Sequence, residues 1–204
     1  MESIPSRRKR ILQGTSWFHG TTLDELDSIK KGICAKHNIR TAHETDFGYG
    51  FYLKSSYVEA AKYIYELQGC TESLGSNQSD CIVCEFFIKP LDYFESSKYN
   101  AKLLCKYDDE FANLVFDNRC NNVSGVQQHE YDIIYGVESD SVPTQEILNY
   151  RLGNSSKEQV IEAFKKSTSM KQLSIHNQEI YDMLILKAVY SFDNPYGERR
   201  ELKL

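Results

Sequence analysis

The stretch from Cys81 to Ile88 most constrains the fold, because it is almost continuously apolar and is followed by Pro90. A short apolar run that ends at a proline is typical of a buried strand. A second buried strand is predicted at Tyr131–Tyr135, where Gly136 follows an apolar and aromatic run. The chain is therefore expected to build its core around β-sheet.

Helices are expected between the strands. Capping-box patterns at Thr22–Glu25 and Ser56–Glu59 predict helices that run to about Gly32 and Leu67. Four further helices and three short strands are predicted from periodicity: helices over 108–116, 144–152, 157–165 and 177–189, and strands over 17–19, 51–53 and 172–175. The order shows no regular βαβ rhythm, so the pattern favours an α+β fold over a doubly wound sheet.

The length of 204 residues suits one main domain with short appendages. We expect a basic N-terminal arm over residues 1–16, a domain over residues 17–189 and a polar tail over residues 190–204, loose from Asn194 onward. Hydrophobic residues make up 41% of the chain, which argues against extensive disorder.

The formal net charge is -5, so the composition gives no global basic footprint for nucleic acid. The run Arg7–Arg10 is the one dense basic cluster, and it is open to two interpretations. It is either an arm for an acidic partner or a solvated, frayed terminus, and the second is commoner. Neither a signal-peptide pattern nor a long apolar segment is evident, so a cytoplasmic protein without membrane contact is expected.

The six cysteines are expected to be reduced thiols in such a compartment. Cys81 and Cys84 have the spacing of a zinc-ligand pair. A structural zinc site needs a second pair of comparable spacing, and the sequence offers none. No metal is therefore expected.

The first candidate site residue is His19, in the sequence Phe18-His19-Gly20-Thr21. A lone strand histidine is usually satisfied by a neighbouring carbonyl group. The glycine behind it favours a ligand, because a residue without a side chain lets a ligand approach the backbone. An amide-bearing ligand could pair with the N–H and C=O groups of Gly20.

The second candidate is the glycine-rich stretch Gly48–Leu53 together with Tyr63. The glycines could form a tight turn with Tyr52 as a core aromatic residue. Alternatively, Tyr52 at a strand end and Tyr63 on the following helix could enclose a flat heteroaromatic ring, with stacking worth roughly 1–3 kcal/mol. Asp46, just before this stretch, is either a turn residue or a group that positions the turn or an acceptor.

Gln172 opens the short strand over 172–175, and an exposed strand glutamine would have no special role. If the chemistry requires an acidic group, Glu130 and Glu179 are the rival candidates.

Taken together, these segments resemble the His–Tyr–Glu/Asp/Gln signature of NAD-dependent ADP-ribosyltransferases, in the branch of diphtheria toxin and the poly-ADP-ribose polymerases. The stretch from Phe18 to Ile64 resembles the NAD-binding half of that branch. The longer stretch from Trp17 to Val189, with Lys171-Gln172-Leu173-Ser174-Ile175-His176, is similar to a little-characterised bacterial family of the same superfamily. The resemblance implies a split β-sheet core with flanking helices.

The resemblance also implies roles for individual residues. The imidazole of His19 would bind an adenosine-ribose hydroxyl, and Gln172 would bind a hydroxyl of the nicotinamide ribose. His19, Tyr52 and Gln172 would form the catalytic set. The positions implied to contact NAD are His19, Gly20, Thr21, Gly50, Tyr52 and Tyr63. The backbone of Gly20 would hold the carboxamide, and the two tyrosines would flank the nicotinamide.

Two departures from the better-known enzymes bear on the activity. Gln172 stands where they carry glutamate, so it brings no charge to an oxocarbenium-like transition state. Transfer of a single ADP-ribose is therefore expected rather than polymer formation. Ala60 stands where the polymerases carry a serine that binds the carboxamide, although Ser55 or Ser56 could compensate.

The resulting expectation is a cytoplasmic toxin or effector, bacterial or phage-associated, that transfers ADP-ribose from NAD to a macromolecular acceptor. The acceptor, protein or nucleic acid, stays open, and an antitoxin or regulatory partner is conceivable. The rival hypotheses are a non-catalytic sensor that binds NAD or ADP-ribose, and an interaction protein whose tyrosines only pack.

Overall fold

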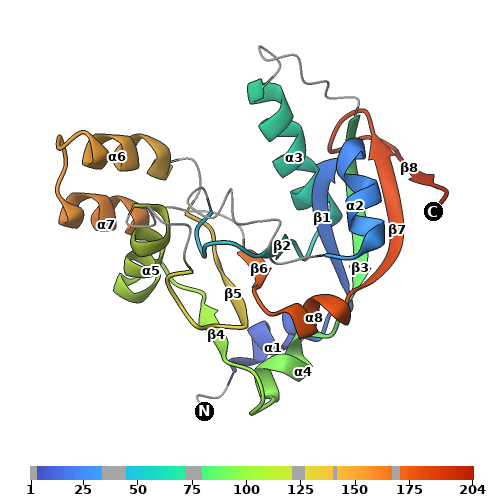
Figure 1. Cartoon of the computed structure of the whole chain (residues 1–204), viewed down its shortest axis with the longest axis horizontal. Helices are drawn as coiled ribbons and strands as arrows, with labels where there is room; N and C mark the ends of the chain where they lie inside the picture. The colour runs from blue at the N-terminus through green and yellow to red at the C-terminus, as the bar shows by residue number, and fades with distance from the viewer. Residues whose placement is uncertain (1–3, 34–44, 72–79, 121–126, 140–141, 167–170) are drawn as a thin grey trace. The chain divides into compact units, whose positions relative to one another are not determined.

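The computed structural model describes residues 4–33, 45–71, 80–120, 127–139, 142–166 and 171–204. The chain forms two compact units, each assembled from separate segments. The first comprises Met1–Ile33, Leu53–Ser96 and Glu179–Leu204, and the second comprises Cys34–Tyr52 and Ser97–Gln178. Each unit contains one of two sheets, so the chain is a mixed α+β protein, as the sequence pattern predicted (Figure 1).

The sheet of the first unit has four strands in the order β1-β3-β7-β8. Its members are β1 (Ser16–Thr22), β3 (Cys81–Phe87), β7 (Ile185–Phe192) and β8 (Arg199–Leu202). All three pairings are antiparallel, and β3 lies between β1 and β7. This central position explains the apolar run at Cys81, because a strand with neighbours on both edges buries most of its side chains.

The helices of the first unit are short apart from one. They are α1 (Ser6–Leu12), η1 (Leu23–Glu25), α2 (Leu26–Lys31), α3 (Tyr57–Thr71), α4 (Pro90–Glu95) and most of α8 (Gln178–Asp182). The long helix α3 packs on the sheet through Ala60, Ala61 and Ile64, against Val83 and Phe192. Small residues at positions 60 and 61 let the helix approach the strands closely.

The sheet of the second unit has the order β2-β6-β5-β4. Its members are β2 (Phe51–Leu53), β6 (Lys171–Ile175), β5 (Ile133–Val137) and β4 (Ala101–Leu104). The central strand β5 is buried along its whole length, pairs in parallel with β4 and pairs antiparallel with β6. The predicted strand at Tyr131–Tyr135 is thus shifted, and Gly136 lies inside it.

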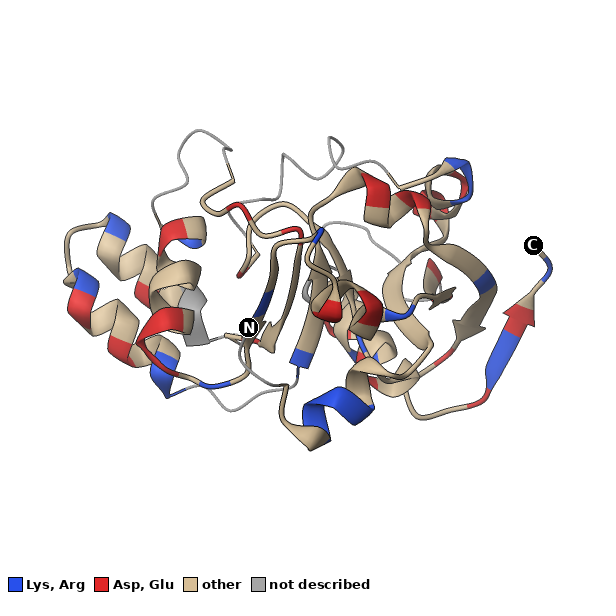
Figure 2. Ribbon diagram, turned by 90° about the horizontal axis from the view of Figure 1, so that it is seen from below, with Lys and Arg blue, Asp and Glu red and all other residues tan. Residues whose placement is uncertain are grey.

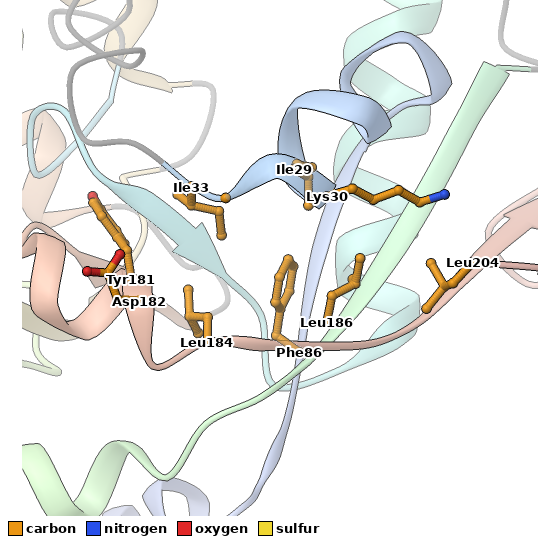
Figure 3. A pocket seen from close by; sticks show the side chains of 10 residues that line it. Ile29, Lys30, Ile33, Phe86, Tyr181, Asp182, Leu184, Leu186 and Leu204 are labelled. Carbon is orange, nitrogen blue, oxygen red and sulfur yellow. The ribbon is translucent and has the colours of Figure 1, made fainter.

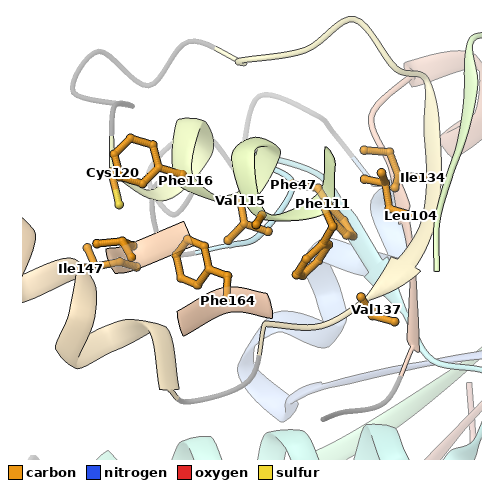
Figure 4. Packing of buried hydrophobic residues seen from close by; sticks show 12 residues of the cluster. Phe47, Leu104, Phe111, Val115, Phe116, Cys120, Ile134, Val137, Ile147 and Phe164 are labelled. Carbon is orange, nitrogen blue, oxygen red and sulfur yellow. The ribbon is translucent and has the colours of Figure 1, made fainter. Parts of the chain in front are cut away.

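Three helices complete the second unit: α5 (Asp109–Arg119), α6 (Val142–Arg151) and α7 (Lys157–Lys165). Side chains from these helices meet those of the sheet in one apolar cluster, which includes Phe47, Phe111, Phe116 and Phe164 (Figure 4). The capping box of Ser156 with Gln159 starts α7 at the predicted residue.

The predicted helix over residues 177–189 is wrong. The helix α8 ends at Asp182, and the following residues form the strand β7 between β3 and β8. Side chains such as Val189, Tyr190 and Phe192 suit a pleated surface, and pairing on both edges outweighs any helical preference. The polar tail is not loose either, since Arg199–Leu202 pair with β7.

The N-terminal arm is also more ordered than predicted. Ser6–Leu12 form α1, and Leu12 is fully buried. The ammonium of Lys9 lies 2.6 Å from a carboxylate oxygen of Glu95 in α4, so the basic run has an acidic neighbour within its own unit. Elsewhere Lys and Arg alternate with Asp and Glu over the helices and loops (Figure 2).

The capping box predicted at Thr22 is absent, because its side chain makes no cap hydrogen bond and a 3-10 turn precedes α2. Besides α1, β7 and β8, the elements α4 and β4 were not predicted either. Pro90 does end β3, and it then occupies the first turn of α4, where its missing N–H has no helical partner to lose.

Candidate functional site

The predicted site residues fall into two groups, one in each unit. His19, Gly20, Thr21 and Tyr63 belong to the first unit. Gly50, Tyr52 and Gln172 belong to the second. Each group is built by its own local structure.

His19 lies in the middle of β1, opposite Cys84 of β3. Side chains alternate between the faces of a strand, so His19 shares its face with Trp17 and Thr21. Thr21 is buried, whereas His19 is half-buried. The strand therefore presents an imidazole at a partly accessible position, in its middle rather than at its end, because β1 continues to Thr22 beyond the predicted strand.

Gly20 is required by the helix packing. A Cβ atom at this position would lie 2.3 Å from the carbonyl oxygen of Ala60 and 3.1 Å from Cβ of Ile64, both on α3. The space left by the missing side chain is thus filled by α3 and is not open to a ligand. This corrects the expectation based on the glycine alone, because the side of Gly20 without a side chain packs against α3.

Position 60, where the resemblance implied a carboxamide-binding serine, lies directly beside Gly20. Ala60 is fully buried. The position therefore packs against β1 and carries no polar side-chain group.

Tyr63 lies on α3 with 49% of its surface exposed. The ammonium of Lys54 lies 5.6 Å from its ring centroid, within the range of a cation–π contact. The ring is therefore suited to a cation, and one is already close to it.

In the second unit, the glycine-rich stretch forms a turn before β2. Gly48 has a φ of 75°, a conformation that favours glycine. The hydroxyl of Tyr52 donates to the carbonyl oxygen of Gly48 at 2.7 Å and accepts from the N–H of Phe47 at 3.1 Å. Burial raises the pKa of Tyr52 above its usual range. The Tyr52 hydroxyl thus closes the turn, as in the packing alternative, while its half-buried ring stacks on Phe47.

Two histidines hold the same turn from the other side. His176 contacts the carbonyl oxygen of Tyr49 through Nδ1 at 2.7 Å, and His129 contacts that of Phe47 through Nε2 at 2.8 Å. A carbonyl only accepts, so these ring nitrogens carry the protons. The other nitrogens accept, from the Ser174 hydroxyl at 2.7 Å and from the Tyr131 N–H at 3.1 Å.

Both histidines are held neutral. Burial lowers the pKa of His176 to about 3, and the nearby His129 adds to the shift. Burial also lowers the pKa of His129. Gly50 is needed beside this pair, because a Cβ there would lie 2.6 Å from Cε1 of His176.

Gln172 is 7% exposed, so it is not the exposed strand residue of the default interpretation. Its side-chain nitrogen donates to Asp46 at 3.3 Å. Asp46 also accepts from the backbone N–H of Ser139 at 2.7 Å, from the Ser139 hydroxyl, and from Arg119 at 3.2 Å. Asp46 is therefore the centre of a polar network rather than a turn residue bonded to its own backbone. The rivals Glu130 and Glu179 are both exposed.

Sequence reasoning missed the roles of four residues of the second unit: Arg119, His129, Ser139 and His176. Only His176 carried a signal, because it ends the Lys171–His176 segment on which the resemblance rests. The others are isolated polar residues whose neighbours come from distant segments. Tyr52 and Gln172 are likewise far apart in sequence, and they lie on the adjacent strands β2 and β6.

A pocket of about 420 Å³ opens elsewhere in the first unit (Figure 3). Its wall is mainly apolar, from Ile29, Phe86, Leu184 and Leu186, with Lys30 and Asp182 at its edge. None of the predicted site residues lines it. It is therefore separate from the residues to which the resemblance assigns chemistry.

The Cys81 and Cys84 thiols do not share a site. Their odd spacing in β3 places them on opposite faces of the sheet, and both are buried. Burial raises the pKa of Cys84 to about 12 and that of Cys81 in the same direction. Cys34 and the side chain of Cys70 lie outside the described residues. Within the described part of the chain, no three His, Cys, Asp or Glu side chains gather as metal ligands would.

Comparison with known proteins gives one match. A family model described as a protein of unknown function (DUF3990) matches residues 19–186, which include every predicted site residue. The chain therefore belongs to the DUF3990 family. No curated protein and no solved structure matches it. None of the helices in the described segments is long and apolar enough to span a bilayer.

Proposed function

We propose that this DUF3990 protein is an NAD-dependent mono-ADP-ribosyltransferase. The observation that carries the proposal is the placement of Tyr52 and Gln172 on neighbouring strands of one sheet, with Gln172 buried and its amide held by Asp46. The resemblance gives the two residues a joint role, and their place on adjacent strands supports it.

The proposed reaction breaks the bond between the nicotinamide nitrogen and C1′ of its ribose. The bonding electron pair leaves with nicotinamide, and positive charge develops on the ribose. A nucleophile of the acceptor then attacks C1′ and releases its proton to solvent. Catalysis needs an acceptor of hydrogen bonds at the ribose hydroxyl and stabilisation of developing positive charge.

The resemblance assigns these functions to particular residues. The carbonyl oxygen of Gln172 would accept from the ribose hydroxyl. The imidazole of His19 would bind the adenosine ribose, and the backbone of Gly20 would bind the carboxamide. Because Gln172 is neutral, the reaction depends more on positioning than on charge, which favours slow transfer of a single ADP-ribose.

The direct test is nicotinamide release from labelled NAD by the purified protein in a cell lysate. His19→Ala and Gln172→Ala should abolish both release and transfer of label to a macromolecule. Glu130→Ala and Glu179→Ala are matched controls, because they remove the rival acidic groups and should leave release intact. Nuclease or protease sensitivity of the label identifies the acceptor class. Absence of both NAD binding and release in any lysate would end the proposal.

A second candidate is a sensor that binds NAD or ADP-ribose without turnover. Ala60 favours it, because the buried position beside Gly20 lacks the hydroxyl that would bind the carboxamide. Calorimetry that detects NAD binding, combined with no nicotinamide release over days, would select this alternative. If the chain is instead an interaction protein whose tyrosines only pack, it would bind neither NAD nor ADP-ribose. A toxin role with a cognate antitoxin stays a prediction.

A further inference from the structure

The carboxylate of Asp46 lies buried at the meeting point of three segments of the second unit. It is 6% exposed, and the side chain of its partner Arg119 is 14% exposed. One oxygen faces Arg119 of α5 and the hydroxyl of Ser139, and the other faces the Ser139 N–H and the amide nitrogen of Gln172. Arg119 also donates to the Ser139 hydroxyl at 3.1 Å, which closes the network.

Every group that faces Asp46 in this network is a donor, and a carboxylate can only accept. The side-chain nitrogen of Gln172 must therefore point at Asp46, and its carbonyl oxygen must point away. A glutamine amide is otherwise free to turn over, because its two ends have nearly the same shape.

We propose that Asp46 is a positioning residue that fixes the Gln172 amide so that its carbonyl oxygen, and not its nitrogen, is presented to the substrate ribose hydroxyl. This inference rests on the proposed function. Without Asp46, the amide could turn and present donors to a hydroxyl. In that case the Gln172 nitrogen would donate to the oxygen of the ribose hydroxyl, and Gln172 would no longer accept the proton of that hydroxyl.

The same geometry accounts for glutamine at position 172. A glutamate there would place a second carboxylate beside Asp46, while Arg119 supplies one positive charge. Two carboxylates at one site cannot both ionise easily. In this protein the negative charge therefore lies at position 46, and position 172 is neutral.

The first experiment compares Asp46→Asn with the wild-type protein in nicotinamide release and NAD binding. Asparagine keeps the size but turns an acceptor into a donor beside Gln172. We expect kcat to fall about 10- to 100-fold from the lost orientation, while KM and the calorimetric Kd for NAD change little. Unchanged kcat in a folded variant would overturn the inference.

Asp132→Asn is the matched control. Asp132 belongs to the same unit and accepts from the N–H of Asn100 at 2.8 Å and from Asn177 at 2.7 Å, but it does not contact Gln172. This variant should lose thermal stability and keep its kcat. If both variants lose kcat in proportion to their fall in Tm, Asp46 has only a structural role and the inference fails.

A second pair of variants tests the same contact from position 172, and its first member leaves Asp46 unchanged in case Asp46→Asn does not fold. The charged and titratable groups that face Asp46 among the described residues are Arg119 of α5 and Tyr52 of β2. Gln172→Glu adds a second carboxylate beside them, so release should acquire a pH dependence that the wild-type protein lacks. The double variant Asp46→Asn/Gln172→Glu again has one carboxylate, and the added pH dependence should disappear.

The outcomes separate the inference from the proposed function. A wild-type protein that releases no nicotinamide contradicts the proposed function. A wild-type protein that is active, with a Gln172→Glu variant whose pH profile matches it, contradicts the inference alone. Release that follows the pattern expected for all four variants supports both.

Discussion

The Tyr52 hydroxyl donates to the carbonyl oxygen of Gly48 at 2.7 Å, four residues back along the chain. The hydroxyl oxygen of Tyr52 also accepts from the N–H of Phe47 at 3.1 Å. A residue expected to contact nicotinamide thus also determines the shape of the turn before its own strand. Its ring and its hydroxyl can be tested separately.

Tyr52→Phe should lower the free energy of unfolding by roughly 1–3 kcal/mol, because the Phe47 N–H loses its acceptor while the ring keeps its stacking partner. Chemical denaturation gives this value. Tyr196→Phe serves as the control, because Tyr196 is highly exposed and its loss should cost little. NAD affinity should be retained in Tyr52→Phe if the ring alone contacts nicotinamide. A stability equal to that of Tyr196→Phe would show that the turn does not depend on this hydroxyl.

Gly48→Ala and Gly153→Ala form a matched pair, because the two glycines have φ values of 75° and 74°. Each alanine incurs a conformational cost of about 1–2 kcal/mol. At Gly48 the new Cβ would also lie 2.6 Å from Oε1 of Gln127 and 2.7 Å from Oδ1 of Asn118, whereas nothing lies within 4 Å at Gly153. Gly48→Ala should therefore be less stable by a further 1 kcal/mol or so, about the lower end of the cost of overpacking, because the ends of two side chains must move. Equal melting curves would contradict the packing of the turn against these two side chains.

The free energy of unfolding should decrease as the pH is lowered below 6.5, the ordinary pKa of histidine. His176 is neutral in the folded protein down to about pH 3, whereas in the unfolded chain it takes up a proton near 6.5. The unfolded state thus binds more protons in this window, and each pH unit costs about 1.4 kcal/mol for this group. His129 acts in the same direction. His176→Asn should show a shallower slope of unfolding free energy against pH than the wild-type protein, and an unchanged slope would contradict the assignment.

Cys81, Cys84 and Cys120 should resist alkylation in the native protein. All three are buried, and burial raises each pKa, to about 12 for Cys84 and about 11 for Cys120. The thiolate is the reactive form, so little of it exists at pH 8. Mass spectrometry after brief treatment with iodoacetamide should find the label on half-buried Cys105 before these three. Rapid native labelling of Cys84 would contradict its burial in β3.

Much of the fold could be predicted from local patterns. The strand at Cys81 and the helices α3, α5 and α7 begin and end close to their predicted residues, because each has a strong apolar period or a cap. The strand β7 could not be predicted in this way. Its pairing with β3 and β8, which come from distant parts of the chain, decides its conformation.

The candidate site also has segments that could be identified from the sequence and contacts that could not. The Phe18–Thr21 and Gly48–Leu53 segments were identifiable because glycine next to a histidine or a tyrosine is a local pattern. The network of Asp46, Arg119 and Ser139 was not, because three ordinary polar residues on separate segments carry no common spacing. The importance of Asp46 to Gln172 is visible only in the contact between them.

The sequence by itself determined which residues are available for chemistry and where strongly periodic stretches such as α3, α5, α7 and β3 form, since these depend on side-chain type and local period. Only the tertiary structure decided how those residues are used. It filled the space beside Gly20 with α3, committed the Tyr52 hydroxyl to its turn, and turned the Gln172 amide nitrogen toward Asp46. The physical reason is that burial obliges each polar group to find a partner, and that partner comes from whichever segment the fold brings near.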